Sequence, residues 1–176
     1  MDTSNEIILT GKLTIADYQK HNYYHHKKLL LFFFILSFFT FLILYISSGV
    51  VSGTRTLVEF VGVVLASMFS GLILLIMWVI LKIRIRNEYN SDQILQNELT
   101  YIITCDGITQ KIKKSINNIE WNDIIAVYEH NELFQLYISK NKAIVLPKKF
   151  FTSVKDADLF KKVIIQNVKI KKVKLM

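Results

Sequence analysis

The sequence lacks several features on which enzymes and secreted domains depend. One of its 176 residues is a cysteine, Cys105, so it offers no internal disulfide and no thiolate metal cluster. Its six glycines are scattered, which excludes a glycine-rich phosphate loop. The motifs G-x-S-x-G, H-E-x-x-H and C-x-x-C are absent as well. We therefore expect no catalytic residue, no metal site, no cofactor and no enzymatic activity.

Charge is missing from two long stretches, Leu29 to Val51 and Phe60 to Leu81. Because a helix rises about 1.5 Å per residue, each run reaches about 33 Å and can cross a hydrocarbon core of about 30 Å. A cleaved signal peptide has a shorter apolar stretch that starts close to the N-terminus. The sequence therefore predicts a transmembrane hairpin over residues 29–81, joined by a short link.

The distribution of basic residues predicts the orientation of this hairpin. The link holds Arg55, which Glu59 offsets. Basic residues instead flank the outer ends of the two runs: Lys20, Lys27, Lys28, Lys82, Arg84 and Arg86. Since cytoplasmic flanks carry the excess of Lys and Arg, both termini are expected in the cytoplasm of a multi-pass plasma-membrane protein.

Small residues recur at four-residue spacing in the second run, at Gly62, Ala66 and Ser70. Such a stripe lets two helices approach closely. We favour packing within the hairpin over a homodimer contact. Neither run has an ionisable residue near its centre, which argues against a proton relay or an ion path.

Two histidines, His21 and His25, stand four residues apart before the first run. On a helix they share one face, which is compatible with metal binding. None of residues 22–28 is a carboxylate or a cysteine that could complete such a site. We favour a short amphipathic helix over residues 15–28, whose Tyr, His and Lys side chains lie at the lipid headgroups. Residues 1–28 thus form an N-terminal segment of one strand, 6–14, and this helix.

Residues 82–176 are expected to form the cytoplasmic domain, and after about Gln96 their apolar residues take a period of two, which is typical of strands. A polar helix continues to about Gln96, and six strands follow between Tyr101 and Pro147, the fourth of them over residues 123–129. Asp106-Gly107 predicts a hairpin, because glycine accepts the positive φ of a tight turn. Apolar residues at three- and four-residue spacing predict a helix over residues 156–172. Strand 6–14 adds a seventh strand if it returns across the membrane hairpin.

A meander of about seven strands closed by a C-terminal helix is the layout of a pleckstrin-homology-like (PH-like) barrel. The fold class expected is therefore α+β: a two-helix transmembrane hairpin with a cytoplasmic, antiparallel β, PH-like domain. Six apolar residues are predicted to hold the barrel together: Trp121, Ile124, Phe134, Leu136, Ile144 and Leu146.

Several short segments of the sequence also resemble those of a known family. "LTIADYQKHNYYHHKK" precedes the two spans, and "YIITCDGIT" and "IEWNDIIAVYEHNELFQLYISKNKAIVLPKKFF" follow them. Together they resemble the YcxB-like family of small bacterial membrane proteins. The resemblance implies a membrane hairpin with a cytoplasmic PH-like domain and implies no particular activity.

The net charge of +8 is gathered largely outside the two apolar runs. Anionic lipid attracts such basic clusters, so Lys148, Lys149, Lys171 and Lys172 are predicted to contact lipid or a partner. A charged surface that only keeps the domain soluble explains these lysines equally well. No recognition helix or aromatic stacking platform supports nucleic-acid binding.

These features favour a protein that binds membrane lipid and a protein partner, or associates with itself. One specific hypothesis is self-immunity of a bacterium against its own membrane-active bacteriocin or toxin, by analogy with other small two-span proteins. The alternative is a membrane-tethered regulatory or envelope-stress module that binds lipid or a protein partner. Glu120 and Asp123 beside Trp121 are interpreted as structural rather than catalytic.

Overall fold

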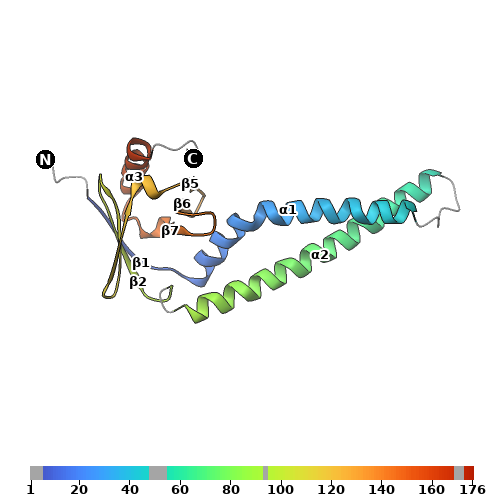
Figure 1. Cartoon of the computed structure of the whole chain (residues 1–176), viewed down its shortest axis with the longest axis horizontal. Helices are drawn as coiled ribbons and strands as arrows, with labels where there is room; N and C mark the ends of the chain where they lie inside the picture. The colour runs from blue at the N-terminus through green and yellow to red at the C-terminus, as the bar shows by residue number, and fades with distance from the viewer. Residues whose placement is uncertain (1–5, 48–54, 93–94, 169–172) are drawn as a thin grey trace. The chain divides into compact units, whose positions relative to one another are not determined.

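The computed structural model describes residues 6–47, 55–92, 95–168 and 173–176 (Figure 1). These residues form two compact units. One unit, residues 22–87, contains most of the two long helices. The other combines residues up to His21 with those from Glu88 onward, and we call it the β-domain.

Helix α1 (Ile15–Ser47) and helix α2 (Arg55–Ser91) run alongside each other in the helical unit (Figure 1). Helix α1 is continuous, so the expected short helix before the first apolar run is its first part. Helix α2 ends at Ser91 rather than near Gln96. Hydroxyls in these helices donate to backbone carbonyls of the preceding turn, as in Thr40 to Leu36 at 2.8 Å. Such bonds satisfy polar groups in an apolar surrounding.

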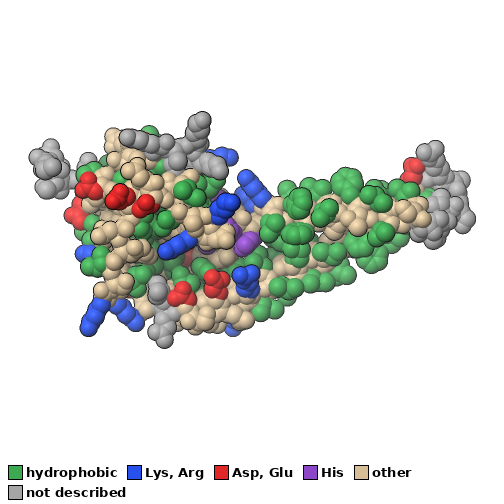
Figure 2. Space-filling model, viewed as in Figure 1, with side chains coloured by type: hydrophobic (Ala, Val, Ile, Leu, Met, Phe, Trp, Pro, Cys, Tyr) green, Lys and Arg blue, Asp and Glu red, His purple; other side chains and the backbone are tan. Residues whose placement is uncertain are grey.

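Both helices are long and apolar enough to cross a membrane. Only 6% and 11% of the residues in their most apolar windows are buried, whereas a core helix of a soluble protein is mostly buried. Hydrophobic side chains cover their visible surface in Figure 2. An exposed apolar surface of this extent indicates a lipid surrounding.

The first sheet of the β-domain has the order β1-β2-β3-β4 and is antiparallel throughout. Its strands are β1 (Ile7–Lys12), β2 (Glu98–Ile103), β3 (Gly107–Ile112) and β4 (Ser115–Glu120). β1 pairs with β2 in a register that sets Leu9 opposite Tyr101. The strand before the membrane hairpin therefore adds to the strands after it, as predicted.

The second sheet has the order β7-β6-β5-β8. Its strands are β5 (Ala126–Glu129), β6 (Leu133–Tyr137), β7 (Ala143–Pro147) and β8 (Val173–Lys174). β5, β6 and β7 form an antiparallel meander, whereas β8 pairs in parallel with β5. The sequence did not predict β8, since two residues are too few to show an alternating pattern.

Two expected segments have different boundaries in the structure. The strand expected from Asp123 begins at Ala126, because Trp121–Asp123 form a turn of 3-10 helix. Helix α3 (Val154–Asn167) begins two residues before the predicted Asp156 and ends before the predicted Lys172. At its start the Ser153 hydroxyl accepts from the Asp156 N–H at 3.2 Å, and the Asp156 carboxylate accepts from the Ser153 N–H at 3.0 Å. This capping box fixes the first turn of the helix.

The core of the β-domain lies where α3 packs on the second sheet. Phe160 of α3 is fully buried, with its ring 5.2 Å from that of Phe134. All six predicted barrel residues are at most 5% exposed, and the Trp121 indole also donates to the Thr104 carbonyl at 3.1 Å. The predicted fold class is confirmed as α+β, with two apolar helices, antiparallel strands and a C-terminal helix.

The hairpin at Asp106-Gly107 is present, but the reason given for its glycine is wrong. The φ of Gly107 does not lie in the left-handed region. A Cβ on Gly107 would instead collide with the Ile119 carbonyl and lie 3.1 Å from the Glu120 Cα. Glycine is needed there because β4 passes so close. The positive φ occurs in the next turn, at Lys113 (φ 52°).

Candidate functional site

A buried glutamine organises the polar face of the second sheet. Gln135 of β6 is 2% exposed. Its amide nitrogen lies 2.8 Å from His21 Nδ1 and donates to the His21 carbonyl at 3.1 Å. Its amide oxygen lies 3.2 Å from His130 Nε2. A buried amide without partners destabilises a fold, so these contacts attach the first part of α1 firmly to β6.

Further polar contacts surround this glutamine and hold the same part of α1. Lys149 pairs with Asp17 at 2.5 Å, and Lys20 pairs with Glu132 at 3.0 Å. The Tyr89 hydroxyl, from the end of α2, donates to the Leu13 carbonyl at 2.9 Å. The contacts around Gln135, the two ion pairs and the Tyr89 bond hold the first part of α1 and the end of α2, which both belong to the β-domain.

A second polar group centres on Glu129 of β5, whose side chain is 1% exposed. Its Oε1 pairs with Lys148 at 2.6 Å and with Lys161 of α3 at 2.9 Å. Its Oε2 accepts from the Met176 N–H at 2.8 Å. Burial acts to raise the pKa of this carboxyl, but the two lysines and the N–H outweigh it and lower the pKa. The carboxylate is therefore held ionised, and it joins β5 to the turn after β7, to α3 and to the C-terminal segment.

The lysines predicted to contact lipid or a partner have defined positions. Lys148 pairs with Glu129 and lies 5.2 Å from the centre of the Phe134 ring, and Lys149 pairs with Asp17. Both are thus part of polar clusters, which the sequence could not show. Lys171 and Lys172 lie outside the described residues.

A different basic surface is exposed at the β3–β4 hairpin. Lys111, Lys113 and Lys114 are exposed there, next to Ile116, which is 62% exposed. Within the part of the chain that the structure describes, none of these three lysines forms an ion pair. This surface combines free positive charge with an apolar side chain, as lipid-contacting loops do.

The small residues of α2 face α1 within the helical unit. Ala66 and Ser70 are 1% and 0% exposed. A Cβ on Gly62 would collide with the ring of Tyr45. Gly71, on the neighbouring row, has nothing within 4 Å of such a Cβ. The stripe of Gly62, Ala66 and Ser70 therefore lies at the contact between the two helices.

The other candidates from the sequence have structural contacts. Asp123 accepts from the Glu120 N–H at 3.3 Å, so it caps the 3-10 turn that begins with Trp121. His21 contacts Gln135, while the rings of His25 and His26 are 4.7 Å apart. Among the residues that the structure describes, no three His, Cys, Asp or Glu side chains are grouped so as to hold a metal ion.

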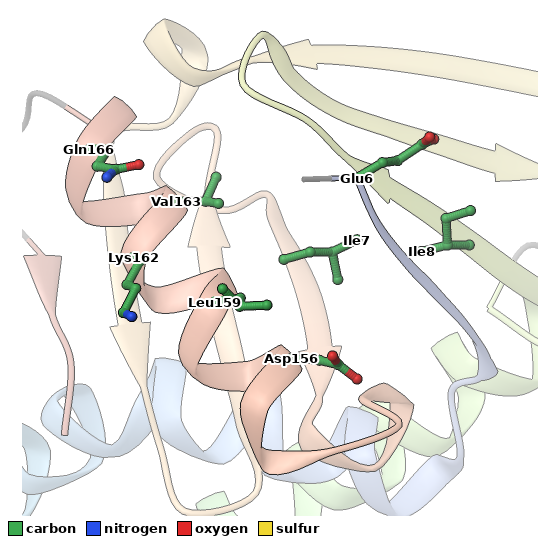
Figure 3. A pocket seen from close by; sticks show the side chains of 8 residues that line it. All are labelled: Glu6, Ile7, Ile8, Asp156, Leu159, Lys162, Val163 and Gln166. Carbon is green, nitrogen blue, oxygen red and sulfur yellow. The ribbon is translucent and has the colours of Figure 1, made fainter. Parts of the chain in front are cut away.

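A hollow of about 260 Å³ lies between β1 and α3 (Figure 3). Ile7 and Leu159 point toward one another across it in Figure 3. Ile8 and Val163 add two further apolar side chains to the lining. The remaining lining residues are charged or polar: Glu6, Asp156, Lys162 and Gln166.

The fold and these clusters define a small α+β domain joined to two helices of membrane-spanning length. Residues 103–164 match the family model described as YcxB-like protein. The chain is also 29% identical over 125 residues to the uncharacterized protein YcxB of Bacillus subtilis (strain 168). That match covers 71% of this chain and 68% of the relative. The two matches support the resemblance to the YcxB-like family that the sequence motifs indicate. No solved structure matches the chain.

Proposed function

We propose that this chain is a non-enzymatic membrane protein that acts by binding at the cytoplasmic membrane. The observation that carries this proposal is the exposure of two long apolar helices in a chain that also forms a compact β-domain with its own core. The helices keep the β-domain at the bilayer surface, where a weak contact with lipid or with a membrane-bound partner gains from high local concentration.

In this proposal the β-domain is PH-like and lies in the cytoplasm, together with both ends of the chain. Seven strands in two sheets before a C-terminal helix support the PH-like layout. The basic flanks of the two helices support the orientation. Binding, rather than catalysis, is assigned because the polar clusters at Gln135 and Glu129 are saturated by contacts within the domain.

The specific role proposed is self-immunity against a membrane-active bacteriocin or toxin. The test expresses the chain in a sensitive bacterium and challenges it with the secreted peptide or toxin encoded beside its gene. Survival is expected to rise with the full chain and not with a chain that lacks residues 98–176. The control is equal insertion of both proteins in the membrane fraction. Unchanged survival with stable insertion of the full chain would overturn the immunity role.

The alternative is a membrane-tethered regulatory module that reads lipid, and the β3–β4 hairpin favours it. The exposed Lys111, Lys113 and Lys114 have no carboxylate partner among the described residues and adjoin the apolar Ile116. Each lysine near an anionic bilayer adds roughly 1 kcal/mol of attraction. Changing the three lysines to glutamine should reduce photocrosslinking to anionic lipid in nanodiscs, and equal crosslinking would exclude this surface.

A further inference from the structure

The C-terminal segment occupies an edge of the second sheet in an unusual way. β5, β6 and β7 are joined as an antiparallel meander. β8 adds to the outer edge of β5 in parallel, setting Val173 opposite Val127 and Lys174 opposite Tyr128. It pairs over two residues, and parallel ladders are slightly less stable per residue than antiparallel ones. Backbone pairing alone therefore holds this strand weakly.

Two side chains beyond the ladder complete the attachment. The Met176 N–H donates to Glu129 Oε2 at 2.8 Å, and Lys161 Nζ donates to the main-chain oxygen of Met176 at 3.0 Å. Glu129 is buried and belongs to β5, whereas Lys161 belongs to α3. Both contacts are made to the backbone of Met176, so they recognise an extended chain and not a particular side chain.

The side chains of the segment alternate between partly buried and exposed positions. Val173 and Leu175 are partly buried, while Lys174 and Met176 are exposed. This is the pattern of a strand that places every second residue against the domain. The site thus consists of a strand edge, two partly buried positions for apolar side chains, and a carboxylate–lysine pair that binds the backbone at one end.

We propose that the outer edge of β5 is a binding site for an extended segment of a protein partner, and that the C-terminal segment of this chain occupies it until displaced. The partner segment runs parallel to β5, places apolar residues at alternate positions and offers a backbone N–H to Glu129 and a main-chain oxygen to Lys161. Adding a strand to an exposed sheet edge is a general mode of peptide recognition. An edge without any cover would promote aggregation, so a displaceable cover serves both needs.

This inference rests on the proposed binding function and names the part of the β-domain that receives the partner. The first test uses the chain truncated after Val168, purified in detergent micelles. The probe is a fluorescent peptide with the sequence of residues 169–176. The truncated chain should bind it saturably, and the full chain about tenfold more weakly, because its own segment competes at high effective concentration. A scrambled peptide of the same composition is the control.

The second test locks the segment in the full chain. Tyr128→Cys and Lys174→Cys stand at paired positions of neighbouring strands, within reach of a disulfide, in a Cys105→Ser background. The oxidised protein should lose binding of the peptide, and reduction of the same sample should restore it to the level of the full chain. This comparison stays decisive if truncation after Val168 prevents folding.

Two results would overturn the proposal. One is a folded truncated chain that binds the peptide no better than the scrambled control. The other is equal binding by the oxidised and reduced forms of the locked chain. A failed protection assay with peptide binding intact would overturn the immunity role and leave the β5 edge as a binding site.

Discussion

Gly62 of α2 lies against the ring of Tyr45 of α1, leaving no room for a Cβ between them. The contact is part of a stripe that continues through the buried Ala66 and Ser70. In lipid, where apolar burial does not drive helices together, such close contact supplies the van der Waals energy of association. The stripe is therefore a structural feature that holds the helical unit together.

Gly62→Leu should separate the two helices. A leucine inserted into a packed contact costs about 1–3 kcal/mol, because the Tyr45 ring and the helix backbone must move. The free energy of unfolding in micelles, measured by titration with SDS, should fall by that amount. Gly71→Leu is the matched control on the same helix and should leave it unchanged, since the space around Gly71 is open.

The same pair of variants separates the two roles considered for small residues in α2. If Gly71→Leu alone destabilised the protein or abolished a dimer in crosslinking, the surface around Gly71 would be a contact between copies. Equal effects of both variants would show that Gly62 and Tyr45 do not form the contact between the helices.

The orientation of the membrane hairpin can be tested with the native cysteine. Cys105 is the sole cysteine of the sequence and is exposed in the β-domain. A membrane-impermeant maleimide should therefore leave Cys105 unlabelled in intact cells and label it after lysis. Cys105→Ser combined with Ser52→Cys, in the link expected outside, should give the reverse pattern. Labelling of Cys105 in intact cells would contradict the cytoplasmic position of the β-domain.

Periodic features of this chain could be predicted from its sequence. The two uncharged runs predict the long helices, and alternation over four or more residues predicts β2 to β7. The core residues follow from the same alternation, since Phe134 and Leu146 lie opposite each other in β6 and β7. Each of these patterns is local and repeated, so it can be recognised without knowing which distant residues pack together.

The polar clusters could not be predicted, because their members are distant in sequence. Glu129 meets Lys148 and Lys161 only after β5, β7 and α3 have packed together. Gln135 looks like one polar residue in an apolar strand, and its partner His21 precedes it by 114 positions. Lys148 looked like an exposed basic residue for the same reason. Gly107 shows a further limit: its residue type was informative, but the close approach of β4 depends on the paired strand.

Stability should depend on pH through Glu129. The lysine contacts lower its pKa in the folded state, so its contribution is complete above its ordinary value of 4.5 and is lost as pH falls through the lowered value. At neutral pH, Glu129→Gln should lower the free energy of unfolding by about 2 kcal/mol, because it removes two charge-assisted contacts of a buried group. Denaturant titrations between pH 7 and about pH 3 should show the free energies of unfolding of the original chain and of Glu129→Gln converging at the acid end.

Asp17 provides the comparison for this pH dependence. Burial acts to raise its pKa, but Lys149 and Thr14 lower it overall from an ordinary value of 3.8. Its contribution is therefore lost at a lower pH than the onset for Glu129. The Asp17→Asn variant should still lose stability as the pH falls below 4.5. The Glu129→Gln variant should not show this loss. An unchanged pH profile in Glu129→Gln would show that its carboxylate does not hold the two lysines.

Gln135 is predicted to control how firmly the first turns of α1 are held. Gln135→Leu keeps the volume and removes the bonds to His21 and His130, leaving those groups without this partner. Hydrogen exchange of residues 15–21 should become faster by about tenfold, as expected for a loss of about 1.4 kcal/mol. Gln110→Leu is the matched control, since it removes one bond to the Tyr101 hydroxyl on the other sheet. Equal exchange of residues 15–21 in both variants would contradict the role of Gln135, because its side chain donates to the backbone carbonyl of His21 in α1.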